Sequence, residues 1–190
     1  MARPLSEDKR NSILQAAADV VAELGVSAPT AKIAKQAGVA EGTLFTYFET
    51  KDALLNQLYL ALKAELEAAM LAGYPSGAGL PERWRHIWDS YLDWGAAQPA
   101  KRKAMRQLGV SDRISEASRQ IGARGFRDIQ AMIEESRAAG VLRDHPPAFG
   151  AAIMESLAET MLEFIAREPR QQEHYKRAGF EAFWNAVALR

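Results

Sequence analysis

The stretch that decides the fold runs from Thr30 to Leu55 and reads TAKIAKQAGVAEGTLFTYFETKDALL. Its apolar residues recur at helical spacing until Gly38-Val39, where the pattern breaks and a second short helical pattern begins at once. Gly38 is expected to adopt a positive φ in this turn. Two helices joined so tightly form a helix-turn-helix, whose second helix is short enough to enter a DNA major groove. An ordinary surface helical hairpin is the alternative.

The predicted motif divides its side chains between a core face and exposed faces. We expect Ile33, Ala34 and Ala37 on the inner face of the first helix and Val39 in the turn. Leu44 and Phe48 would pack inward from the second helix. The side chains left on its other faces include two aromatic rings and are Thr43, Phe45, Thr46 and Tyr47. Exposed aromatic rings on so short a helix favour a binding surface.

These residues resemble the DNA-binding end of the TetR family of transcriptional regulators. The positions that carry the resemblance are, in order, Thr30, Ile33-Ala34, Ala37-Gly38-Val39, Gly42-Thr43-Leu44-Phe45, Tyr47-Phe48, Lys51 and Leu54-Leu55. The rest of the chain agrees with that family in length and helical layout. The resemblance implies an all-α fold with two domains. Residues 1–50 would form a three-helix, homeodomain-like helix-turn-helix domain, and residues 51–190 a helical domain for effector binding and dimerisation.

The resemblance also implies roles for individual residues at a DNA interface. Thr30 is expected to cap its helix and hold a phosphate there, and Tyr47 and Lys51 to contact further phosphates. Glu41 would either accept from a cytosine amine or cap its own helix. Phe45 stands where relatives often carry Tyr, and would contact a thymine methyl group. The full predicted set is Thr30, Lys32, Glu41, Gly42, Thr43, Phe45, Tyr47 and Lys51.

Charge alone leaves DNA binding undecided. The chain has 24 basic and 24 acidic residues, and residues 1–52 carry six basic side chains against seven acidic ones. A DNA-binding module usually shows a basic footprint, so the contacts here must be local. The predicted recognition helix has no Arg or Lys. Readout of guanine by a basic side chain would therefore come from Lys32 or from Arg3 in the N-terminal arm.

Composition excludes several other classes of protein. At 190 residues and 48% hydrophobic content, the chain can form one compact domain or a small domain joined to a larger one. It has no Cys, its three His lie at no metal-ligand spacing, and it has no phosphate-binding glycine motif. We therefore expect no enzyme activity, no cofactor and no metal. Its charged N-terminus and the lack of a long apolar run predict a cytoplasmic protein without membrane contact.

The remaining pattern is helical throughout, with no useful alternation of polar and apolar residues. A loop over residues 73–81 is rich in helix breakers. One long helix is expected over residues 111–139, with Ile121 among its inward residues. The other expected helices span about residues 6–24, 51–71, 81–98, 100–108, 148–166 and 170–189.

Two apolar stripes on the last two helices predict a homodimer. They consist of Phe149, Ile153, Leu157 and Met161, and of Phe180, Phe183, Trp184 and Val187. Burial within one subunit explains such stripes equally well. The resemblance favours dimerisation, because relatives pair these helices as a four-helix bundle across a two-fold axis. A two-fold dimer of this kind reads an inverted repeat in DNA.

The resemblance finally implies a small-molecule effector held among the helices of the larger domain. The candidate lining residues are Trp88, Tyr91, Met105, Phe126, Met132 and Met154. Aromatic and Met side chains at helical spacing are also typical of a plain core. The predicted function is a ligand-responsive repressor that leaves a palindromic operator when an effector binds. The alternative is a helical dimerisation or scaffold protein without specific DNA binding.

Overall fold

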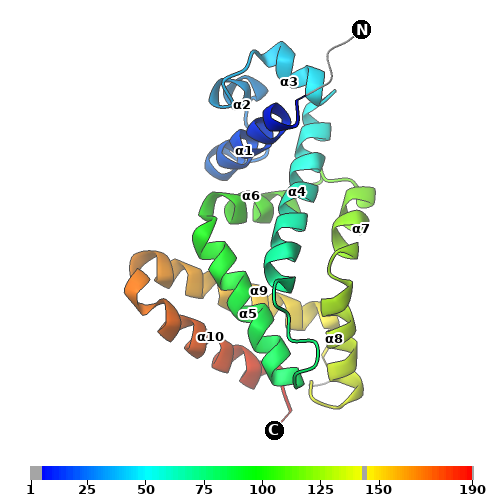
Figure 1. Cartoon of the computed structure of the whole chain (residues 1–190), viewed down its shortest axis with the longest axis vertical. Coiled ribbons are helices and arrows are strands. Elements are labelled where there is room, and N and C mark those ends of the chain that lie inside the picture. The colour runs from blue at the N-terminus through cyan, green and yellow to red at the C-terminus, as the bar shows by residue number, and fades with distance from the viewer. Residues whose placement is uncertain (1–5, 143–144, 190) are drawn as a thin grey trace. The chain divides into compact units, whose positions relative to one another are not determined.

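The fold is all-α, as predicted. The structure is a computed structural model that describes residues 6–142 and 145–189. Within these ranges the helices are α1 (Glu7–Leu24), α2 (Thr30–Gln36), α3 (Glu41–Tyr47), α4 (Lys51–Leu71), α5 (Leu80–Ala97), α6 (Pro99–Gly109), α7 (Glu116–Arg124), α8 (Arg127–Ala138), α9 (Pro147–Arg167), the 3₁₀ helix η1 (Pro169–Gln171) and α10 (Gln172–Val187) (Figure 1). None of these helices is both long and apolar enough to cross a membrane.

The chain divides into two compact units. The first comprises Met1–Glu65 and Gln98–Gly125, and the second comprises Leu66–Ala97 and Phe126–Arg190. Residues of α4 belong to both units. The predicted boundary after residue 50 does not coincide with a limit of these compact units, and as a boundary between a DNA-binding and an effector-binding domain it stays a prediction.

The first unit is built around α1. Ser6 caps this helix by accepting the backbone N–H of Lys9, and the chain leaves it at Gly25, which has a φ of 84°. The inner face of α1 includes Ile13 and Val21, both fully buried. This face packs against α2 and α6. The expected limits of the helix are confirmed because its start and stop signals are local.

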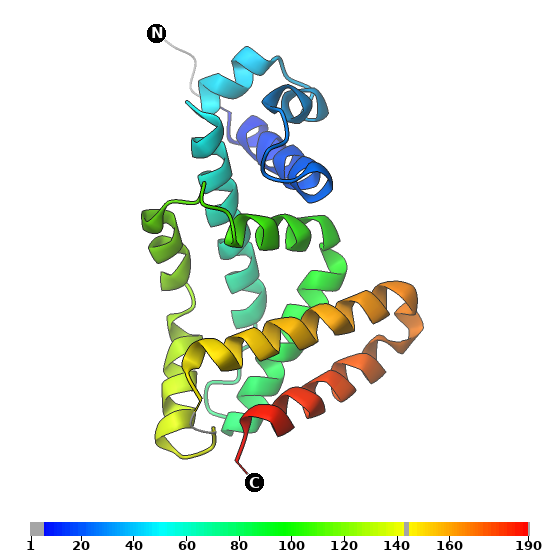
Figure 2. The same cartoon turned by 180° about the vertical axis from the view of Figure 1, so that it is seen from behind.

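The second unit holds the aromatic core. In α5, the Trp84, Ile87 and Trp88 side chains are buried. Figure 2 shows α9 and α10 running side by side, and both helices pack on α5. Phe183 of α10 stacks on Trp88 with a centroid separation of 5.9 Å. Gly179 of α10 gives the close approach that this packing needs, because a Cβ there would lie 2.6 Å from Trp88 Cζ2.

The single helix expected over residues 111–139 is wrong. The structure has two helices, α7 and α8, separated at Gly125 and Phe126. The two helices belong to different compact units, so their apolar residues serve two cores instead of one stripe. Ile121, expected to face inward, is 51% exposed. The inward position is Gly122, whose Cβ would lie 3.1 Å from the Tyr59 ring.

Candidate DNA-binding site and ligand cavity

A tight turn joins α2 to α3 in the first unit. Gly38 has a φ of 68°, as predicted, and its N–H donates to the Lys35 carbonyl at 3.2 Å. The Val39 N–H donates to the Ala34 carbonyl at 3.0 Å. These bonds close α2 and allow α3 to begin at Glu41. The turn is therefore specified by one left-handed glycine and two short hydrogen bonds.

The core face of this motif is as predicted except at Ala37, which is only half-buried. Ile33 and Leu44 are fully buried, and Ala34 and Phe48 are nearly so. Burial of these residues fixes α3 against the rest of the first unit. The helix then presents its other faces outward, and the Phe45 ring is 40% exposed there. An exposed ring on a helix this short is available for contact with another molecule.

Polar groups at the two ends of α3 are already engaged within the chain. The Thr30 hydroxyl donates to Glu41 Oε1 at 2.6 Å, which joins the starts of α2 and α3. The Thr46 hydroxyl donates to the Gly42 carbonyl at 3.0 Å. The prediction that Thr30 caps α2 is wrong, because Pro29 holds the cap position and Thr30 is the first helical residue. Glu41 likewise makes no capping bond to α3.

The hydroxyl of Tyr47 lies at the start of α1. It accepts the backbone N–H of Ser6 at 3.1 Å, and the Tyr47 ring is half-buried. A phenol that accepts one hydrogen bond still has its own proton to donate. The bond to Ser6 thus holds Tyr47 in place and leaves it able to donate to a phosphate oxygen.

Lys51 is the first residue of α4 and lies close to a second cation. Partial burial, and then the positive charge of Arg113, lower the pKa of Lys51 below its usual value, while Asp52 acts in the opposite direction. Asp52 is itself paired with Arg113, with 2.7 Å between Oδ1 and Nη1. An anion placed beside Lys51 would favour its charged form and offset the repulsion from Arg113.

The other predicted DNA-binding residues have simpler surroundings. Lys32 and Gly42 are exposed, and a Cβ on Gly42 would meet no atom within 4 Å. Thr43 is half-buried on α3. Arg3, the second basic candidate for base readout, lies outside the described residues. Arg10 is committed to the fold, since its guanidinium donates to Gln57 and lies over the Phe48 ring.

The second unit contains an apolar cavity of about 200 Å³. Side chains from α4, α5, α8, α9 and α10 line it, including Met70, Trp84, Ile87, Ile129 and Phe183. Two lining side chains carry or can carry positive charge, Arg137 and His145. No Asp or Glu is found among its described lining residues.

The cavity includes only part of the predicted effector site. Phe126 and Met154 line it. Trp88 and Met132 are fully buried in the core instead, and the Tyr91 hydroxyl donates to Glu159. Met105 lies on α6 and belongs to the first unit. The two polar lining residues, Arg137 and His145, were not predicted from the sequence. Arg137 lies in the last turn of α8, and His145 lies just before α9.

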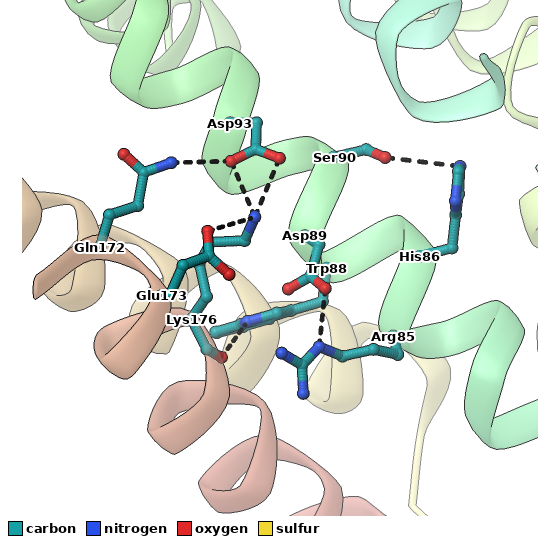
Figure 3. Close-up of polar contacts among 9 residues, drawn as sticks. All are labelled: Arg85, His86, Trp88, Asp89, Ser90, Asp93, Gln172, Glu173 and Lys176. Carbon is teal, nitrogen blue, oxygen red and sulfur yellow. Dashed lines mark hydrogen bonds and ion pairs between the residues drawn. The ribbon is translucent and has the colours of Figure 1, made fainter. Parts of the chain in front are cut away.

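An ion-pair cluster around the buried Lys176 joins α5 to α10, and it was not predicted from the sequence. Figure 3 shows Lys176 of α10 directed at Asp93 of α5, with Nζ 2.9 and 3.0 Å from the two carboxylate oxygens. The Lys176 carbonyl also accepts the indole N–H of Trp88 at 2.9 Å. Burial opposes the charged form, but the hydrogen bond and the charge of Asp93 raise the pKa of Lys176 above its usual value. This cluster fixes α10 on α5.

The two predicted dimer stripes are partly used by the chain's own core. Phe183 and Val187 are buried, and both line the cavity. Phe149 is 48% exposed. The remaining members of the stripes are half-buried and are Ile153, Leu157, Met161, Phe180 and Trp184. A partner subunit could contact this second group, and their role at an interface stays a prediction.

Comparisons with a family model and with solved structures both find similarity to TetR-family regulators. Residues 13–58 match the family model described as bacterial regulatory proteins, tetR family. A TetR-family transcription regulator from Shewanella sp. PV-4 is 30% identical, with a TM-score of 0.83 over 96% of this chain and 99% of that chain. The TetR-like regulator LfrR from Mycobacterium smegmatis, solved with proflavine, shares the fold with a TM-score of 0.68 at 20% identity, over 93% and 95% of the two chains.

A curated relative matches over a shorter segment. The fatty acid metabolism regulator protein of Bacillus subtilis (strain 168) is 46% identical over 52 residues, which is 27% of this chain and 27% of that protein. The match is therefore confined to about a quarter of that regulator's length.

Proposed function

Because this chain belongs to the TetR family of transcriptional regulators, we propose that it binds an inverted-repeat operator as a homodimer and leaves it when a small molecule fills the cavity of the second unit. The observation that carries the DNA-binding part is the α2–α3 motif, in which a glycine turn and a buried inner face present α3 outward.

Base recognition by α3 depends on Phe45 and Thr43. The recognition helix has no basic residue, and the hydroxyls of Thr30 and Thr46 donate within the motif. The groups left to face the bases are the exposed Phe45 ring and the Thr43 side chain. An aromatic ring contacts the thymine methyl group in the major groove. The half-site should therefore contain a thymine that Phe45 touches.

Deoxyuridine tests this contact directly, because it differs from thymidine only by the methyl group. Replacing that thymine should weaken binding about fourfold per half-site, since burial of one such carbon contributes about 0.8 kcal/mol. The loss should vanish in Phe45→Ala, which removes the ring. Equal affinity of the wild-type protein for both operators would remove Phe45 from base recognition.

Phosphate binding is assigned to Lys51 and Tyr47. Lys51 carries a positive charge next to Arg113, and Tyr47 has a phenol proton to donate. Such contacts position a protein on the duplex without reading its sequence. They make the affinity depend on salt, since each phosphate that is neutralised releases a counterion.

The release step needs an effector that favours one conformation over another. Helix α4 begins at Lys51, shortly after the α2–α3 motif in the sequence. Near its other end it carries Met70, which lines the cavity. A ligand that moves Met70 would thus act on the same helix that carries a phosphate contact. LfrR, which shares the fold, was solved in complex with proflavine, and this supports a small-molecule effector for the present chain.

Fluorescence anisotropy on the DNA flanking the gene tests the proposal. The wild-type protein should bind a short inverted repeat specifically, and Lys51→Ala should lose affinity and reduce the dependence on salt by about one counterion. Lys103→Ala is the matched control, because Lys103 is exposed on α6 outside the motif. No binding by the folded protein at any salt concentration would favour a helical dimerisation protein instead.

A further inference from the structure

The cavity of the second unit combines an apolar wall with a single arginine among its described lining residues. Its wall is formed by aliphatic, aromatic and Met side chains, and the charge comes from Arg137 at the end of α8. His145, which precedes α9, adds a ring nitrogen that can donate a hydrogen bond. Among the described lining residues no carboxylate is found that could serve as a counterion for a cationic ligand.

Arg137 is available to a ligand. Its guanidinium has one ion-pair partner in the described part of the chain, Glu134, at 3.9 Å. That separation is too long for a hydrogen bond, and the Glu134 side chain is 71% exposed. Exposed pairs of this kind contribute little. Arginine keeps its charge at any physiological pH and binds carboxylates through two parallel hydrogen bonds.

We infer that the effector is an amphipathic monoanion, a carboxylate whose head group pairs with Arg137 and whose apolar body fills the cavity. This inference rests on the proposed function and names the ligand class of that site. The volume limits the size of the body: an engineered cavity of about 150 Å³ takes up benzene, so about 200 Å³ holds an apolar body of about eight carbon atoms. A medium-chain or aryl-alkyl carboxylate fits both limits.

Three probes with the same eight-carbon alkyl group and different head groups test which ligand charge the cavity prefers. Octanoate, octan-1-ol and octylammonium are titrated into the full-length protein without DNA, with isothermal calorimetry as the readout. Octanoate should bind at one site per chain and at least tenfold more tightly than octan-1-ol, because a hydrogen bond to a charged group is lost in the alcohol. Octylammonium should bind more weakly than either.

Two variants and a control locate the site. Arg137→Gln should reduce octanoate affinity to that of octan-1-ol and leave the affinity for the alcohol unchanged, which also shows that the variant is folded. Gly150→Leu should weaken both, because Gly150 lines the cavity and a side chain there meets open space. Arg167→Gln is the matched control, since that side chain is 70% exposed on α9 and does not line the cavity.

The outcomes are distinct from those of the DNA experiment. Equal binding of the three probes, tighter binding of octylammonium, or full octanoate affinity in Arg137→Gln would overturn the inference. Absence of binding by all three probes would overturn it as well. None of these results depends on operator binding, so a regulator with a different effector would still bind its DNA in the anisotropy assay.

Discussion

Gly179 in α10 marks the place where the second unit has no room for one more carbon atom. A Cβ there would lie 2.5 Å from Met161 Cγ and 2.6 Å from Trp88 Cζ2. The Met161 side chain is unbranched and half-buried, so it can move aside. Trp88 is fully buried, stacks on Phe183, and donates to the Lys176 carbonyl. The indole cannot shift without giving up that hydrogen bond and that stacking.

We therefore expect Gly179→Ala to destabilise the protein. Overpacking costs about 1–3 kcal/mol, and loss of the buried Trp88 hydrogen bond adds about 1 kcal/mol. The gain in helix propensity from Gly to Ala returns about 1 kcal/mol. The net loss is about 2 kcal/mol. Gly150→Ala in α9 is the matched control: its Cβ meets nothing within 4 Å, so the same exchange should stabilise by about 0.5–1 kcal/mol.

Urea unfolding followed by circular dichroism measures both variants. The protein concentration is held constant, because the stability of the proposed dimer would depend on it. The midpoint should fall for Gly179→Ala and rise slightly for Gly150→Ala. If both exchanges raised the midpoint equally, the close packing of α10 on Trp88 would be refuted.

Three further predictions concern charged groups. Lys176→Met should lower the free energy of unfolding by about 2 kcal/mol. This loss is smaller than that for a fully buried pair, because the Asp93 side chain is 52% exposed to water. The loss should shrink when Asp93→Asn is also present, and equal losses with and without Asp93→Asn would show that the pair is not coupled. Since the folded-state pKa of Lys176 is raised, its contribution is complete below the unfolded value of about 10.4 and is lost as the pH rises through the folded pKa. Above the folded-state pKa of Lys176, the free energies of unfolding of wild type and Lys176→Met should converge. A difference between them that does not change with pH would contradict the raised pKa. Glu41→Gln removes a negative charge from α3 and keeps an acceptor for Thr30, so operator affinity should rise a few-fold in anisotropy titrations; a large loss would instead mean that Glu41 accepts from a base.

The helix-turn-helix could be predicted from sequence because its signals are local. Gly38 adopts the left-handed conformation that its place between two apolar patterns demanded, and Ile33 and Leu44 are buried as their spacing indicated. The partner of Thr30 could not be predicted in this way. Its hydroxyl donates to Glu41, eleven positions along the chain, and capping patterns consider only the nearest three or four residues.

The ligand cavity was harder to predict because burial and cavity lining have the same sequence pattern. Trp88 and Met132 have the residue types of a pocket, yet both are fully buried in the core. Arg137 has the residue type of a surface helix end, yet it lines the cavity. Which apolar side chains leave a gap depends on how distant helices pack, and helical periodicity carries no information on that.

For a related reason, the two predicted dimer stripes could not distinguish burial within one chain from burial against a partner subunit. Phe183 and Val187 belong to the same apolar stripe as Phe180 and Trp184. In the structure the first two are buried within the chain and the second two are half-buried. A stripe on one helix shows that the face is covered, and only the position of α5 shows which residues the chain itself covers.

The most direct test of the central claim is an operator titration with and without octanoate, followed by anisotropy at fixed salt. We predict that two chains bind one inverted repeat, that octanoate releases the DNA, and that Arg137→Gln binds the DNA normally but is not released. Specific DNA binding that no ligand of the cavity alters would contradict the account. So would octanoate release that persists unchanged in Arg137→Gln.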